Sequence, residues 1–182
     1  MRFLFPGFIR AHMACQMGLS IALLTPLLCH GAEHAFGSFR IAVDADQSEY
    51  ISASDYQITV ENEELLLSRL TASHLGKLSN SFVADLNKDG SFEVVVTFTH
   101  TGGHETGVHL YTWSDYRLSP IKVAELDDGQ RDGYQGNDQF AVADGKLLRI
   151  FQIYEQSGAT WEPTAQQRRL RYSLQDNRWV AE

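Results

Sequence analysis

The chain has 182 residues, of which 23 are acidic, 15 are Lys or Arg, and 43% are hydrophobic. This length suits one ordinary domain, and the hydrophobic fraction is large enough for a packed core, which excludes wholesale disorder. The net charge of −8 argues against a protein that binds nucleic acid or docks on anionic lipid, because both need an excess of Lys and Arg.

The first 32 residues differ in character from the rest of the chain. Their only charged residues are Arg2 and Arg10, and a short apolar run over 14–29 is followed by the small residues Gly31 and Ala32. A basic start, a short apolar stretch and a small-residue end are typical of a secretory signal peptide, whereas a membrane span needs about 20 apolar residues. We expect residues 1–32 to be a signal peptide that is cleaved near Gly31 or Ala32.

Cleavage there would leave a mature domain over residues 33–182. Cys15 and Cys29 would leave with the signal peptide, so the mature domain would have no disulfide although its export predicts an oxidising compartment. Loss of the two arginines changes the formal charge from −8 to −10. We expect an exported protein that is not held in a membrane after cleavage and whose core alone stabilises it.

The mature chain is predicted to consist of strands joined by polar turns. Apolar residues alternate with polar ones along several segments, and Asp144-Gly145 is a favoured two-residue hairpin turn. The expected strands lie near residues 39–43, 56–60, 92–98, 108–113, 140–142, 147–154, 170–174 and 179–180, while 65–67 fits either a strand or a helix. Along 108–113, one face is expected to carry Val108, Leu110 and Thr112, and the other His109, Tyr111 and Trp113. Turn signals recur about every ten residues, which favours an all-β, antiparallel sandwich or barrel-like single domain.

Oxygen-bearing side chains recur in the segment 85–93, at Asp85, Asn87, Asp89 and Glu93. Such side chains can converge on a hard cation such as calcium. The segment is not an EF-hand, because the twelfth position counted from Asp85 is valine rather than Glu. The alternative is a turn between two strands, in which Asp and Asn bond their own backbone, and we favour this interpretation over a calcium site.

His100, His104, Glu105 and His109 have side chains of the kind that bind zinc. The zinc-protease pattern is incomplete, because valine stands where its second histidine should be, and the neighbouring glycines indicate a loop rather than a helix. We interpret the segment 100–107 as a Gly-rich exposed loop, and such loops often carry recognition.

Two further segments carry polar residues. Residues 134–140 are predicted to form a polar turn that enters a strand, with Asp138 as a turn acceptor, and Arg168, Arg169 and Arg171 are predicted to lie on a solvated strand. The sequence contains neither a nucleophile elbow nor a phosphate-binding loop. We therefore expect a protein that is not an enzyme.

The order of these motifs resembles the periplasmic inhibitors of invertebrate-type lysozyme (PliI). The resemblance covers most of the mature chain, from about Phe36 to Trp179, and includes the Gly-rich loop. The segments that carry it are Ser81–Gly90, Glu93–Val96, Tyr134–Phe140, Leu147–Arg149 and Phe151–Tyr154. It implies a small antiparallel β domain in the Gram-negative periplasm that blocks the cleft of a lysozyme and has no catalytic activity of its own.

The resemblance places the partner-binding loop at Thr101, Gly102, Gly103, His104, Glu105 and Thr106. The family's inhibitory Ser-Gly-x-Tyr motif falls on 102–105, where the glycine matches at Gly103 but both hydroxyl residues are missing. The family's Pro-Thr-Gly-Gly stretch reads Pro-Thr-Ala-Gln at 163–166. The resemblance therefore implies fold and export more directly than it implies inhibition.

The charge of the mature domain predicts the kind of partner. A net charge of −10 would speed encounter with a basic lysozyme, and would do so less at high salt. The alternative is a periplasmic β domain with another binding function, including calcium binding, and without lysozyme inhibition. No organic cofactor is expected, and the oligomeric state stays open, with a homodimer as one alternative.

Overall fold

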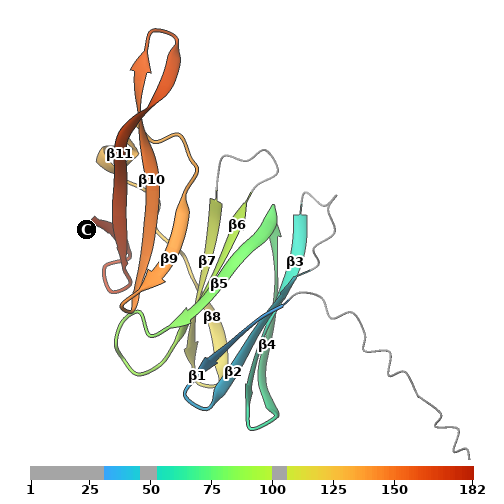
Figure 1. Cartoon of the computed structure of the whole chain (residues 1–182). Helices are drawn as coiled ribbons and strands as arrows, with labels where there is room; N and C mark the ends of the chain where they lie inside the picture. The colour runs from blue at the N-terminus through green and yellow to red at the C-terminus, as the bar shows by residue number, and fades with distance from the viewer. Residues whose placement is uncertain (1–30, 46–52, 100–105) are drawn as a thin grey trace, which may run out of the picture.

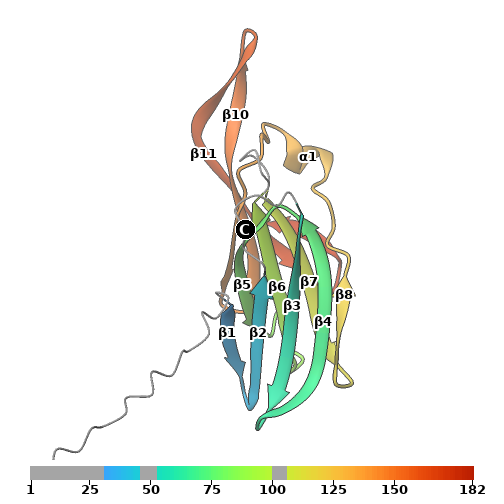
Figure 2. The same ribbon diagram turned by 90° about the vertical axis from the view of Figure 1, so that its right-hand side faces the viewer.

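The computed structural model describes residues 31–45, 53–99 and 106–182. Within these ranges the chain forms twelve strands and one short helix, and the strands make three four-stranded antiparallel sheets (Figures 1 and 2). The expected all-β antiparallel fold is confirmed. Among the described residues the sheets are stacked and open rather than closed into a barrel.

Each sheet is built from strands that are consecutive in the chain. The first sheet contains β1 (Ala32–Phe36), β2 (Phe39–Ala45), β3 (Ala53–Asn62) and β4 (Leu65–Leu75). The middle sheet contains β5 (Lys77–Ala84), β6 (Glu93–Thr99), β7 (Thr106–Ser114) and β8 (Arg117–Ile121). The third sheet contains β9 (Gln139–Ala143), β10 (Lys146–Ser157), β11 (Thr160–Ser173) and β12 (Arg178–Ala181), and α1 (Asp128–Arg131) lies between β8 and β9 in the chain.

The middle sheet is covered on both faces, as Figure 1 shows. The front core lies between the first and middle sheets and includes Ile41, Val43, Tyr56, Ile58, Val60, Phe92, Val94, Val96, Phe98, Tyr111, Trp113 and Leu118. The rear core lies between the middle and third sheets and includes Val95, Leu110, Leu126, Leu147, Phe151, Leu170, Tyr172 and Trp179. Because successive residues of a strand point to opposite faces, β6 contributes to both cores, and its residues 93–98 are all buried.

Local sequence signals account for several connections. Asp144 and Gly145 both have positive φ and join β9 to β10, as the predicted hairpin requires. Residues 65–67, which fitted either a strand or a helix, begin β4. On β7, Leu110 lies in the rear core while Tyr111 and Trp113 lie in the front core, which confirms the predicted division of its two faces.

The first described strand begins at Ala32, next to the predicted cleavage position. Its residues pair with β2 along their full length, from Ala32 opposite Val43 to Phe36 opposite Phe39. The helical part of the described chain contains no segment that is long and apolar enough to cross a membrane.

Candidate functional site

The predicted partner-binding loop lies largely outside the described residues. Thr101, Gly102, Gly103, His104 and Glu105 belong to the undescribed segment 100–105, as does His100. The structure does place the two strands that this segment joins, because β6 ends at Thr99, and Thr99 pairs with Thr106, the first residue of β7. The root of the loop is therefore a paired end of the middle sheet.

The side chains of the Asp85–Asp89 turn bond mainly to the backbone of the turn itself. The Asp85 carboxylate accepts hydrogen bonds from the amides of Asp89 (3.1 Å) and Gly90 (2.9 Å). Asn87 Oδ1 accepts from the Asp89 amide (3.0 Å), and Asp89 Oδ1 accepts from the Ser91 amide (2.8 Å). These contacts match the turn interpretation, in which Asp and Asn replace missing backbone partners.

Glu93 belongs to a different environment from the three turn side chains. It is fully buried, and its carboxylate accepts hydrogen bonds from the Leu86 amide (2.9 Å) and the Thr112 hydroxyl (3.1 Å). Burial raises the pKa of Glu93, and the charges of Asp89 and Asp85 act in the same direction. Within the described residues, no group of three or more His, Cys, Asp or Glu side chains is arranged to hold a metal ion.

His109 makes its polar contact inside the front core. Its Nδ1 atom lies 2.6 Å from the Tyr56 hydroxyl, and that hydroxyl is also hydrogen-bonded to the Tyr111 hydroxyl. Next to it, the His74 ring stacks on Phe98 with 3.7 Å between ring centroids. Burial lowers the pKa of His109, so the neutral imidazole is favoured there.

The rear core contains a buried ion pair between Asp138 and Arg149, whose side chains are 1% and 13% exposed. Arg149 Nε donates to Asp138 Oδ1 (2.9 Å) and Arg149 Nη2 donates to Asp138 Oδ2 (2.8 Å). The Tyr134 hydroxyl donates to the same carboxylate (2.7 Å) and accepts from Arg149 Nη2 (3.0 Å). Two parallel hydrogen bonds between guanidinium and carboxylate are a strong and directional arrangement.

The interpretation of Asp138 as a turn acceptor is therefore incomplete, because its carboxylate forms this ion pair. A signal for the contact was present in the sequence. The two-residue turn at 144–145 sets the register that places Phe140 opposite Arg149, so Asp138 comes close to Arg149. Sequence reasoning missed the pair because it treated residues 134–140 without their partner strand.

Aromatic rings surround the Arg149 guanidinium. Its central carbon lies between 5.3 and 5.9 Å from the ring centroids of Tyr134, Phe140, Phe151 and Trp179. These distances allow cation–π attraction, which compensates part of the cost of burying the charge. Burial and the hydrogen bond to Asp138 raise the pKa of Tyr134 to about 12, so the phenol stays protonated and keeps donating.

Another predicted surface residue also has a structural contact. Arg168 Nη1 donates to the carbonyls of Gly129 (2.8 Å), Gln130 (2.6 Å) and Asp132 (3.2 Å). Arg168 therefore ties α1 and the residue after it to β11. The prediction of a solvated position fits Arg169, which is exposed and pairs with Glu182 (2.6 Å).

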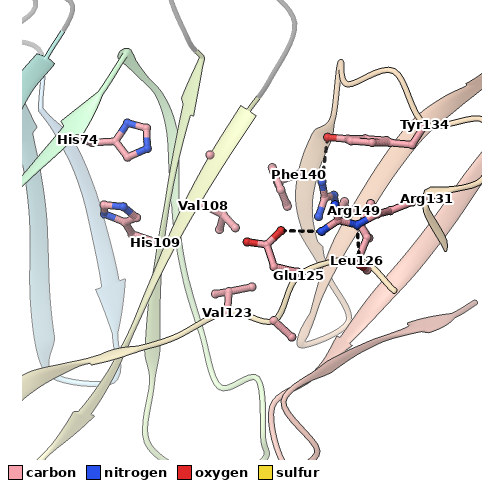
Figure 3. A pocket seen from close by; sticks show the side chains of 12 residues that line it. His74, Val108, His109, Val123, Glu125, Leu126, Arg131, Tyr134, Phe140 and Arg149 are labelled. Carbon is pink, nitrogen blue, oxygen red and sulfur yellow. Dashed lines mark hydrogen bonds and ion pairs between the residues drawn. The ribbon is translucent and has the colours of Figure 1, made fainter. Parts of the chain in front are cut away.

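A pocket of about 350 Å³ lies between β7, the connection before α1, and strands β9 and β10 (Figure 3). Its walls include Val108, Val123, Leu126 and Phe140, and its polar lining includes His74, His109, Glu125, Arg131, Tyr134 and Arg149. Arg131 and Glu125 form an exposed ion pair of 3.2 Å. A concave site whose hydrogen-bonding groups are held in fixed positions can recognise a ligand or a partner side chain.

The pocket adjoins the root of the predicted loop, since Gly107, Val108 and His109 line it. Gly107 has a packing role, because a Cβ atom at this position would lie 2.6 Å from His74 Nε2. The absence of a side chain at Gly107 thus leaves room for the His74 ring just after the predicted loop.

Searches against family models, curated proteins and solved structures find no match for this chain.

Proposed function

We propose that the protein is an exported binding protein, similar in its action to the periplasmic inhibitors of invertebrate-type lysozyme, and that it acts by recognition rather than catalysis. The observation that carries the proposal is the paired root of the loop 101–106, where Thr99 pairs with Thr106. This loop joins two strands of the middle sheet, and β6 is buried on both faces up to Phe98. A recognition loop on a rigid scaffold loses less conformational entropy on binding than a loop on a flexible scaffold does.

The neighbouring pocket supports recognition at this end of the sheet. Arg149 and Tyr134 are held by Asp138, and His109 is bonded to Tyr56, so these polar groups have fixed partners and orientations. Fixed donors next to a loop provide additional contacts for a protein partner. A basic lysozyme would complement the net charge of this protein, which is −8 for the full chain.

Export is part of the proposal, and the basic start, short apolar run and small-residue end of residues 1–32 support it. The measurement is the intact mass of the protein recovered from a periplasmic fraction after expression of the full chain in a Gram-negative host. We expect a species that lacks residues 1–31 or 1–32. A mass that retains them would contradict export by a cleaved signal peptide.

Lysozyme inhibition is tested in a cell-wall lysis assay with an invertebrate-type lysozyme. We expect weak inhibition by the natural protein and stronger inhibition by the Gly102→Ser, Glu105→Tyr double variant, which restores both hydroxyl residues. Each restored hydrogen bond to a charged cleft group is worth about ten- to a hundredfold in affinity. The matched control is Ser114→Ala at the other end of β7, which should leave inhibition unchanged.

Two outcomes would contradict this proposal. One is nanomolar inhibition by the natural protein that survives deletion of His104 and Glu105, which would exclude the loop as the site. The other is failure of both the natural protein and the double variant to bind any lysozyme tested, although both are folded. That result would leave the alternative, a β domain with another binding function.

A further inference from the structure

Strands β10 and β11 form a hairpin that projects past the rest of the third sheet (Figures 1 and 2). β9 pairs with β10 only over residues 146–150, and β12 pairs with β11 only over 170–173. The hairpin itself continues to the pair Ser157–Thr160. Its outer part is therefore a two-stranded ribbon without a further strand on either side among the described residues.

The two faces of this ribbon differ in chemistry. Residues directly opposite each other in an antiparallel pair point to the same face, and successive residues alternate. Tyr154 faces Pro163 and Gln156 faces Trp161, so Tyr154 and Trp161 share one face, whereas Glu155 and Glu162 face each other on the opposite side. The ribbon thus presents an aromatic face and an acidic face.

Trp161 is the exposed tryptophan of this protein. It is 48% exposed, whereas Trp113 is 7% and Trp179 is 3% exposed. A large aromatic side chain left in water on a projecting hairpin does not contribute to either core. Tryptophan combines a large apolar ring with a polar N–H group and is enriched at interfaces where one end is apolar and the other is wet.

Trp161 lines a surface hollow of about 430 Å³ together with Tyr154, Gln135 and Asn137. This volume lies within the range of about 300–1,000 Å³ that is typical of small-ligand sites. All four side chains are uncharged and carry polar groups: an indole N–H, a phenol and two amides. Each of them can donate a hydrogen bond to a ligand, and the phenol and the two amides can also accept one.

The segment that supplies the two amides is held in place by the buried ion pair. Tyr134 and Asp138 bond to Arg149 on the inner side, while Gln135 and Asn137, at alternate positions, line the hollow. The segment also pairs with β10, because the Tyr154 amide donates to the Gly133 carbonyl (2.8 Å). The close approach requires glycine, since a Cβ atom at Gly133 would lie 2.6 Å from the Tyr154 carbonyl oxygen.

We propose that this hollow binds a neutral oligosaccharide. A sugar ring has apolar C–H faces that pack against aromatic rings, and its hydroxyls both donate and accept hydrogen bonds. Gln135 and Asn137 match this requirement, because an amide group also donates and accepts. The absence of a charged side chain from the hollow's lining favours a neutral sugar over a phosphate, a uronic acid or a basic peptide.

The first test is titration of the purified protein with chitotriose, cellotriose and maltotriose, monitored by tryptophan fluorescence and NMR. The second test is binding of the protein to a printed array of neutral and acidic glycans. A neutral oligosaccharide is expected to change the fluorescence of Trp161 in a saturable way. Loss of aromatic packing in Trp161→Ala should weaken binding by about tenfold or more, and Trp161→Phe should retain most of it. Gln135→Ala should weaken binding by about five- to tenfold.

The matched control is Glu162→Gln on the acidic face of the same ribbon, which should leave the affinity unchanged. Amide NMR spectra establish that each variant keeps the hairpin. The proposal is overturned if no neutral glycan binds at millimolar concentration while the hairpin is intact. It is also overturned if only acidic glycans bind, or if Trp161→Ala binds as tightly as the parent. Because no lysozyme enters the assay, its outcome is independent of the inhibitor proposal.

Discussion

The front and rear cores share the middle sheet but bury different kinds of polar group. In the front core, Tyr56, Tyr111 and His109 form a hydrogen-bonded group without a formal charge. In the rear core, the buried polar groups include a full ion pair, Asp138 with Arg149. The pocket and the hollow that we describe both adjoin the third sheet, and His74 and His109 of the front core also line the pocket.

The two kinds of buried polar group differ in their cost. Neutral groups can be buried at low cost once they are hydrogen-bonded, whereas a buried ion pair rarely adds more stability than apolar packing would. The Asp138–Arg149 pair instead holds the segment 134–138 in one position. The pair thereby fixes groups that line the pocket, whereas the neutral network of the front core joins β3 to β7.

Among the substitutions that test this comparison, Asp138→Ala should have the largest effect on the unfolding free energy. It would leave the buried Arg149 charge without its partner, and breaking such a pair typically costs about 3–5 kcal/mol of unfolding free energy. Urea unfolding of the mature domain measures the loss. The control is the double variant Asp138→Leu, Arg149→Met, which removes both charges and should recover most of the stability. A loss below about 1 kcal/mol in the single variant would show that the pair is not truly buried.

Tyr56→Phe tests the neutral network of the front core and should have a smaller effect. The substitution keeps the ring but removes the hydroxyl that bonds to His109 and Tyr111. Leaving buried groups unpaired costs about 1–3 kcal/mol, measured by the same unfolding experiment. Tyr116→Phe is the control, since Tyr116 is 72% exposed and should change stability by less than about 0.5 kcal/mol. Equal effects of the two substitutions would contradict a buried network.

Glu93→Gln should change how the unfolding free energy depends on pH more than it changes the unfolding free energy at any one pH. Burial raises the pKa of Glu93 above its ordinary value of 4.5 in the folded state. The stability gained from the bound proton is complete at low pH and is lost as the pH rises through the folded pKa. Glutamine can keep both contacts, with its oxygen toward the Leu86 amide and its NH₂ toward Thr112.

We therefore expect Glu93→Gln to be at least as stable as the parent at neutral pH, and its unfolding free energy to fall less as the pH rises above the ordinary carboxyl pKa of 4.5. The control is Glu64→Gln on an exposed turn between β3 and β4. A variant that is less stable than the parent at neutral pH, with an unchanged pH profile, would show that the ionised carboxylate is the form that the fold requires.

Calcium should have the smallest effect on stability. The oxygens of Asp85, Asn87 and Asp89 already accept backbone hydrogen bonds, so millimolar calcium should leave the melting temperature of the mature domain nearly unchanged. A real site at a hundredfold excess of calcium over its Kd would add about 2.7 kcal/mol. A clear rise in melting temperature that disappears in Asp89→Ala would favour the calcium interpretation over the turn.

The local pattern of the sequence determined many of the strands and several turns, but β1, β5 and β8 were not predicted. Alternation of apolar and polar residues predicted β2, β3 and β7, and the Asp144-Gly145 pair predicted the β9–β10 hairpin, because these features depend on the period of a strand and on positive φ. The same information was enough to divide the faces of β7. It also led to the turn interpretation of Asp85–Asp89, whose hydrogen bonds are local.

Only the tertiary structure decided how many layers the sheets form and which distant residues meet. Residues 93–98 have side chains that point in both directions, and the sequence does not state what covers each face. The Asp138–Arg149 pair and the hollow at Trp161 depend on how one hairpin lies against another segment. Such contacts arise from packing between strands, and strand periodicity carries no information about packing partners.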